Sequence, residues 1–194
     1  MKDFFRMVGV LTVICALSGY ILAYTNRVTQ APIEESKRRE KLDALKKVLP
    51  PCDNEPDRTV FKATEAGRDW TFYVARKDGG YAGAAFVASS SKGYAGLIEV
   101  LVGVKADGTI CGIEILTQSE TPGLGTKIAD PANPFRVQFP GRAAAGTKWK
   151  LKKDGGDLDG ITGATISSRA VAEAAGEGIE VFGRHKAEIE ATGQ

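Results

Sequence analysis

Twenty consecutive residues from Met7 to Asn26 carry no charge, and this run constrains the chain more than any other feature. As an α-helix rising ~1.5 Å per residue, it is long enough to cross the ~30 Å hydrocarbon core of a bilayer. A cleavable signal peptide would also place basic residues, here Lys2 and Arg6, before an apolar run. The run is long for such a peptide and no small-x-small cleavage site follows it, so the sequence favours a retained membrane anchor over residues 1–27.

The composition fits one globular domain with a short appendage. The chain has 194 residues, 43% of them hydrophobic, and single domains usually occupy roughly 100–200 residues. Its 26 basic and 24 acidic residues give a formal net charge of +2, without the basic surplus that binding to a phosphate backbone requires. We therefore expect no nucleic-acid partner.

The cysteine and histidine content argues against a metal site. Cys15, Cys52 and Cys111 are far apart and form no C-x-x-C pair, so neither a zinc site nor a disulfide framework is expected. The single histidine, His185, cannot provide multi-histidine ligation, and its charged neighbours predict a solvated surface position. No metal ligand is therefore assigned.

Residues 28–50 predict a helical stalk between the anchor and the domain. Leu42, Leu45 and Val48 recur at the spacing of one helix face, and Leu49-Pro50-Pro51 is typical of a helix end. The predicted domain comprises the remaining residues, 51–194.

The first half of this domain has the alternating pattern of an antiparallel meander. Asp78-Gly79 and Asp107-Gly108 are strong hairpin signals between β-rich runs. Residues 117–160 show little periodicity and predict long loops with short elements near 135–139 and 149–151, whereas apolar spacing predicts a helix from Thr165 to about Ile189. The expected fold class is α+β, an antiparallel sheet with packed helices, preceded by one N-terminal transmembrane helix. The expected strands are 70–74, 81–88, 95–104 and 109–116.

The most informative stretch is residues 159–168, DGITGATISS, which lies where a loop becomes a helix. The start of a helix offers unpaired N–H groups and the positive end of the helix dipole, and both suit a phosphate. Gly163 and Ala164 are small enough to let an anion approach the backbone, and the hydroxyl residues supply donors and a possible nucleophile. By spacing alone a simpler interpretation also fits, in which Thr162 only caps the helix.

The Asp-rich loop before the helix, residues 154–160, invites comparison with a calcium-binding EF-hand loop. Counting on from Gly155, however, Ile166 occupies the position of the bidentate glutamate, so the calcium interpretation fails. We assign Asp159 to the DGITGATISS stretch and expect the other aspartates to be solvated.

Within that stretch, D-x-x-T-G-A-T resembles the flavinylation motif of the FMN-binding domain family. In that family a dedicated flavin transferase takes FMN from FAD and attaches it by a phosphoester to the final Thr, which is Thr165 here. A second stretch, residues 119–128 (SETPGLGTKI), resembles the E-T-P-G-L-G segment beside the flavin ring in the same family. Taken alone, the second stretch is a Pro-Gly turn that fits neither a dinucleotide fingerprint nor a P-loop.

The resemblance implies one covalent cofactor, FMN, carried by Thr165 as a phosphoryl threonine. No catalytic residue is expected, because the cofactor carries the electron chemistry and the protein sets its position and potential. Six further contacts are implied. Glu120, Thr121 and Leu124 would line the flavin ring, and Thr162, Gly163 and Ala164 would shape the phosphate end.

The order of elements along nearly the whole chain resembles the G subunits of Rnf ion-translocating electron-transport complexes. This implies an electron-transfer subunit of a complex that couples electron flow between ferredoxin and NAD to Na⁺ or H⁺ transport. The implied partners are the other subunits of the membrane complex and, for maturation, the flavin transferase. Basic residues flank the span on both sides and do not set its orientation. The resemblance implies a single pass through the inner (cytoplasmic) membrane, with the soluble domain on the periplasmic or extracytoplasmic side.

Three other interpretations stay open from the sequence. The C subunit of the sodium-translocating NADH:quinone reductase has the same motifs in a longer chain. A membrane-anchored, non-redox module could hold a small anion at the helix start. A stand-alone flavin reductase is the third, although the motifs lack convergent His or Arg residues.

Overall fold

The computed structural model describes residues 1–65 and 67–193, apart from the side chain of Ala31, and the chain divides into two compact units. The first unit, Met1–Lys41, consists of most of α1, an α-helix over Lys2–Val48. An apolar segment of α1 is long enough to cross a membrane, and none of it is buried in the protein. No other helix in the described residues is both long and apolar enough to do so. The predicted N-terminal membrane helix is therefore present as a candidate span.

The predicted domain boundaries at residues 27 and 50 stay a prediction. α1 continues through residue 27 without a break and ends at Val48, directly before the predicted stop at Leu49-Pro50-Pro51. Residues from Leu42 onward belong to the second unit, so the last turns of α1 are part of the folded domain.

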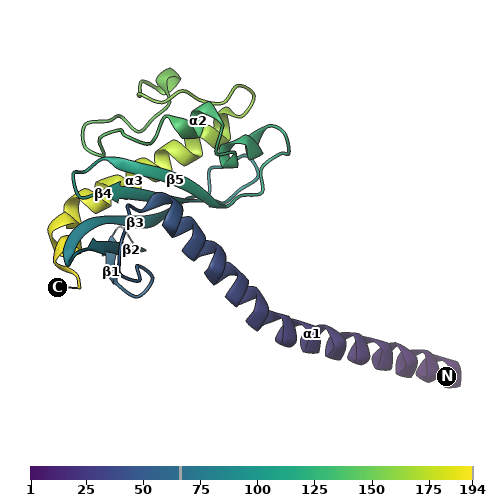
Figure 1. Cartoon of the computed structure of the whole chain (residues 1–194). Coiled ribbons are helices and arrows are strands. Elements are labelled where there is room, and N and C mark those ends of the chain that lie inside the picture. The colour runs from purple at the N-terminus through teal and green to yellow at the C-terminus, as the bar shows by residue number, and fades with distance from the viewer. Residues whose placement is uncertain (66, 194) are drawn as a thin grey trace. The chain divides into compact units, whose positions relative to one another are not determined.

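The second unit, Leu42–Gln194, is built on a five-stranded antiparallel sheet whose strands lie side by side in chain order (Figure 1). The two-residue turn Asp78-Gly79 has positive φ angles of 51° and 77°, as a type I′ hairpin requires. The predicted α+β class and its antiparallel sheet are confirmed. The strands are β1 (Val60–Glu65), β2 (Arg68–Lys77), β3 (Gly80–Ser90), β4 (Ile98–Lys105) and β5 (Ile110–Thr117).

The four predicted strands correspond to β2, β3, β4 and β5, although β4 begins three residues later than predicted, at Ile98. β1 escapes prediction from the sequence. It is an edge strand with no fully buried residue, and charged side chains such as Lys62 and Glu65 interrupt its apolar pattern.

One face of the sheet is covered by α3 (Thr165–Ala191), within two residues of the predicted helix (Figure 1). The core between them contains Phe72, Phe86 and Phe182, whose ring centroids are 5.6–6.3 Å apart. Gly178 lets α3 approach β3, because a Cβ there would lie 2.2 Å from a ring carbon of Phe86. This packing fixes the helix whose first residue is Thr165.

The opposite face of the sheet buries the end of α1. Leu45 and Val48 pack there with Tyr73 and Leu101, since successive side chains of a strand point to opposite faces. A Cβ at Gly103 would lie 1.9 Å from the carbonyl oxygen of Val48. The helix end therefore reaches the sheet only because β4 has no side chain at Gly103.

The segment between β5 and α3 contains the short elements η1 (Gly125–Ala129), α2 (Pro134–Val137) and η2 (Lys152–Asp154). Arg136 of α2 is buried and donates to the carbonyl oxygens of Ile113 and Ala129, tying η1 to β5. Around the predicted element at 149–151, the structure has an isolated bridge between Leu151 and Leu158. These loops bring η1 into contact with α3.

Candidate functional site

α3 begins at Thr165, and its N-cap residue is Ala164, which makes no side-chain capping bond. Thr162 lies outside the helix, and its hydroxyl bonds to no described residue, so the interpretation of Thr162 as a helix cap is wrong. The N–H groups of Thr165, Ile166 and Ser167 also lack a partner in the described part of the chain. The helix start thus offers free N–H groups and the positive end of the dipole to an anion.

Ser168 fixes the loop that precedes the helix. Its fully buried hydroxyl accepts from the N–H of Ile161 at 3.0 Å and donates to the carbonyl oxygen of Ala164 at 2.9 Å. The side-chain amide of Gln138 accepts from the N–H of Asp159 and donates to the carbonyl oxygen of Asp159, both at 2.8 Å. The loop conformation is therefore held by bonds within the protein.

Thr165 lies where two clefts meet. It is half-buried and lines both a larger cleft of about 490 Å³ and a smaller cleft of about 280 Å³. Its hydroxyl has no hydrogen-bond partner among residues 1–65 and 67–193. This hydroxyl is therefore available to an incoming group.

The larger cleft brings together the two stretches that the sequence singles out. Thr162 is the one predicted contact that does not line it, and lies in the smaller cleft instead. The other predicted residues all line the larger cleft: Glu120, Thr121, Leu124, Gly163, Ala164 and Thr165.

Four lining residues of the larger cleft are absent from the sequence prediction: Tyr94, Gly125, Ile166 and Ser167. Gly125, Ile166 and Ser167 lie within the two informative stretches, so their neighbours could have indicated them. Tyr94 lies in the loop before β4, where the sequence carries no signal for a site.

Glu120 connects three segments beneath the larger cleft. It is 4% exposed, and its Oε2 accepts from the hydroxyl of Ser167 at 2.6 Å while its Oε1 accepts from the N–H of Ala95 at 3.0 Å. Gly125 leaves room for it, because a Cβ there would lie 2.7 Å from Oε2. Both carboxylate oxygens are thus engaged within the protein, and Glu120 shapes the cleft.

Apolar side chains dominate the rim of the larger cleft. Tyr94, Leu124 and Ile166 remain 70%, 46% and 45% exposed and gather around this one cleft, and a grouped apolar surface of this kind marks an interaction site. The volume of the cleft falls within the ~300–1,000 Å³ typical of small-molecule sites. Its volume and apolar lining fit an aromatic ligand placed next to the hydroxyl of Thr165.

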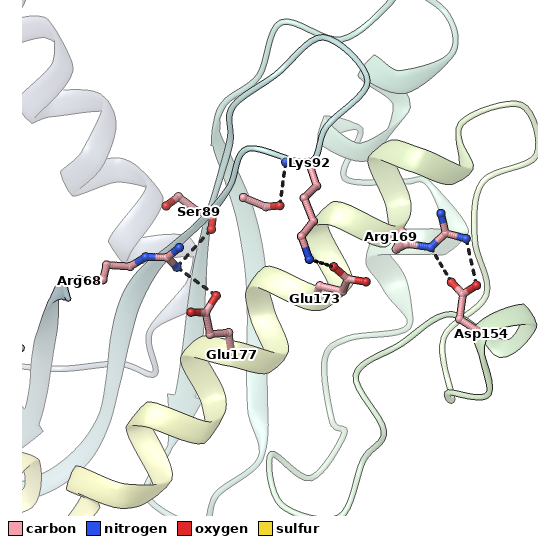
Figure 2. A network of polar contacts seen from close by, with 8 residues as sticks. Arg68, Ser89, Lys92, Asp154, Arg169, Glu173 and Glu177 are labelled. Carbon is pink, nitrogen blue, oxygen red and sulfur yellow. Dashed lines mark hydrogen bonds and ion pairs between the residues drawn. The ribbon is translucent and has the colours of Figure 1, made fainter. Parts of the chain in front are cut away.

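Ion pairs along one side of α3 hold the loops around the site (Figure 2). Asp154 accepts from Arg169 through both oxygens at 2.8 and 2.9 Å, and this guanidinium lowers the pKa of Asp154 below its ordinary value. One turn further along, Glu173 pairs with Lys92 at 2.9 Å. Figure 2 shows that these contacts join α3 to the loop before β4 and to the end of η2.

The described residues contain no group of three His, Cys, Asp or Glu side chains arranged to hold a metal ion. The three cysteines are free thiols. His185 is partly exposed, with Nδ1 lying 3.0 Å from Glu188.

Comparisons with known proteins relate this chain to a known family. Residues 93–180, which include both stretches and α3 as far as residue 180, match the FMN-binding domain family. In the solved structures, NqrC of Shewanella oneidensis shares the fold, with a TM-score of 0.52 and 21% identity over 76% of this chain and 74% of that chain.

Curated relatives match nearly the full length of the chain. The chain is 36% identical to the G subunit of an ion-translocating oxidoreductase complex from Vibrio atlanticus, over 86% of this chain and 83% of the relative. It is 35% identical to the corresponding G subunit of Cereibacter sphaeroides, over 94% and 84% of the two chains, and 37% identical to that of Pseudomonas aeruginosa, over 84% and 80%. The resemblances inferred from the two motifs and from the order of elements are confirmed, and the chain belongs to the family of G subunits of ion-translocating oxidoreductase complexes.

Proposed function

We propose that this chain carries one FMN, bound covalently through its phosphate to the hydroxyl of Thr165, and passes electrons within a membrane-bound, ion-translocating oxidoreductase complex. The observation that carries the proposal is the hydroxyl of Thr165, which has no partner in the described chain and opens onto a cleft of about 490 Å³ with an apolar rim. The match of residues 93–180 to the FMN-binding domain family supports FMN as the ligand.

The residues of the larger cleft suit the flavin ring. Leu124, Ile166 and Tyr94 offer exposed apolar surface that a bound ring would cover, and burial of apolar surface favours binding by roughly 25 cal/mol per Å². The free N–H groups at the start of α3 and the positive end of its dipole would stabilise the phosphate. The bound flavin would supply one- and two-electron chemistry, and the protein would set its position and solvent access.

Attachment needs a second protein, the flavin transferase, and FAD as the donor. The Oγ of Thr165 would form a bond to the phosphorus of the FMN half of FAD, and the bond between that phosphorus and the bridging oxygen would break. AMP would leave with the bridging oxygen. The hydroxyl proton would be lost, so the chain would gain the mass of FMN less one water. Thr165 would act as the acceptor only, because no side chain of the described residues binds its hydroxyl as a base.

The names of the curated relatives, which state that they are subunits of ion-translocating complexes, support a place for this chain among other subunits. We propose that α1 anchors the chain by a single pass in the inner membrane, with the domain of residues 51–194 on the extracytoplasmic side and residues 28–50 as a stalk whose last turns, from Leu42, pack on that domain. Electrons would pass between neighbouring redox centres of the complex, in a flow between ferredoxin and NAD that is coupled to Na⁺ or H⁺ transport.

Intact-mass analysis tests the attachment. The full chain would be coexpressed with the transferase, purified in detergent, weighed and digested. We expect one FMN less one water on the peptide that contains Thr165, and ultraviolet fluorescence of the denatured band in a gel. Thr165→Val, which keeps the side-chain shape and removes the oxygen, should abolish both signals.

The matched control is Thr64→Val, which removes an exposed hydroxyl on β1, outside both clefts, and should leave the adduct intact. An unmodified wild-type chain in the presence of active transferase would contradict the proposal. It would favour a non-redox module that binds a small anion at the start of α3.

A further inference from the structure

The smaller cleft shares Thr165 with the larger cleft but differs from it in charge. Glu120 is the one charged residue among the described residues that line the larger cleft. The smaller cleft is lined by two lysines, Lys152 and Lys153, against one aspartate, Asp159. Because opposite charges attract, an anion at Thr165 is favoured on the side of the lysines and disfavoured on the side of Glu120.

Both lysines are held near the first turns of α3. They lie in η2, which ends at Asp154, and Asp154 binds Arg169 of α3 through both carboxylate oxygens (Figure 2). The Nζ of Lys152 lies 2.7 Å from the carboxylate of Asp159, the first residue of the flavinylation motif. Lys153 has no ion-pair partner among residues 1–65 and 67–193.

We propose that the smaller cleft is the subsite for the phosphate group of the flavin nucleotide, with Lys152 and Lys153 as its cationic contacts. This rests on the proposed function, because it takes the ring to occupy the larger cleft and Thr165 to be the point of attachment. Two lysines against Asp159 leave one net positive charge, which matches the single negative charge of a phosphodiester. The free N–H of Thr165, the residue that lines both clefts, adds a neutral donor.

The subsite can be tested without covalent attachment, on the full chain purified in detergent without the transferase and carrying Thr165→Ala. This protein would be titrated with FMN and with riboflavin, which has the same ring and ribityl chain but no phosphate. At low ionic strength we expect FMN to bind about tenfold more tightly than riboflavin, the size of effect typical of two partly exposed ion pairs. The preference should shrink at 0.15 M salt, where the Debye length falls to ~8 Å.

The lysines would then be replaced together, as Lys152→Gln and Lys153→Gln. We expect the preference for FMN to fall to about twofold or less, with the affinity for riboflavin unchanged, which also shows that the larger cleft is intact. The matched control replaces Lys62 and Lys77, exposed lysines on β1 and β2 outside both clefts, with Gln. It removes the same charge and should keep the tenfold preference.

Equal affinities of FMN and riboflavin for the Thr165→Ala chain would overturn the proposal, and so would the absence of measurable binding of either flavin. A preference for FMN that survives the loss of both lysines would overturn it as well. Failure of the proposed function is a separate result, because it appears as a wild-type chain that stays unmodified by intact mass, whatever the two affinities are.

Discussion

The hydroxyl of Ser167 donates to Oε2 of Glu120 at 2.6 Å, although the two residues lie 47 positions apart in the chain. Ser167 belongs to the first turn of α3, and Glu120 belongs to the stretch after β5 that precedes η1. The other oxygen of Glu120 accepts from Ala95 in the loop before β4. This single carboxylate therefore holds together the three segments that line the larger cleft.

Removing that carboxylate should loosen the domain. Glu120→Ala leaves the buried hydroxyl of Ser167 and the N–H of Ala95 without their acceptor, so we expect the free energy of unfolding to fall by about 3 kcal/mol. Glu120→Gln keeps the shape and can still bind both groups, since a serine hydroxyl accepts as well as donates, and should cost less than about 1 kcal/mol. Urea unfolding followed by tryptophan fluorescence measures both. Equal losses for Ala and Gln would contradict this role for Glu120.

Much of the sheet could be predicted because its signals are local. Asp78-Gly79 determines a hairpin by its own backbone preference, and the apolar spacing after Thr165 marks α3 without reference to the rest of the chain. β1 and the packing of Leu42–Leu49 on the sheet depend on partners distant in the sequence, so no local pattern indicates them.

The site divides in the same way. The two motifs indicated Thr165 and most of the larger cleft through a resemblance that spacing alone would not supply. Tyr94 and the engagement of both oxygens of Glu120 could not be predicted, because they arise where the loop before β4 meets α3 and the stretch before η1. The sequence likewise does not show that Lys152 and Lys153 share a cleft with Thr165.

Gly103→Ala should detach the end of α1 from the sheet. The added Cβ would lie 1.9 Å from the carbonyl oxygen of Val48, which belongs to the backbone and cannot rotate away, so we expect a loss of about 3 kcal/mol in the free energy of unfolding. Trypsin should then cut faster after Lys46 and Lys47. Gly112→Ala is the control, because Gly112 pairs with Gly103 across the sheet and has open space around it. It should change stability by less than about 0.5 kcal/mol, and equal sensitivity of the two variants would refute the explanation.

The Asp154–Arg169 pair should give the domain an acid-sensitive contribution to stability. Arg169 lowers the pKa of Asp154 in the folded protein. The stabilisation by the pair is therefore complete above the ordinary aspartate pKa of about 3.9 and is lost as the pH falls from there through the lowered pKa of the folded state. The difference in Tm between wild type and Asp154→Asn should be constant from pH 7 to about pH 5 and shrink below about pH 4. Arg169→Gln should reproduce the same curve, and a difference that grows in acid would argue against the pair.

Cys52 offers a test of the proposed membrane orientation. It is an exposed thiol in the second unit. Partial desolvation and the neighbouring carboxylate of Asp53 raise its pKa, so its labelling by a maleimide should accelerate as the pH rises through the mildly alkaline range. In a chain with Cys15→Ser and Cys111→Ser, a membrane-impermeant maleimide added to spheroplasts at pH 8.5 should label Cys52. Protection until the membrane is permeabilised would place the domain on the cytoplasmic side.

The two hydrogen bonds of Ser168 have a consequence for maturation. They shape the D-x-x-T-G-A-T loop from the first turn of α3, and α3 is held in place by its packing on the sheet, which an isolated segment lacks. Such a segment also lacks Gln138, whose side chain binds the main chain of Asp159. A transferase that recognises this loop conformation would modify the folded domain and would not modify the same sequence in an unfolded chain. A synthetic peptide of residues 157–170 should accordingly be a far poorer acceptor than the intact protein, and loading with flavin would report that folding is complete.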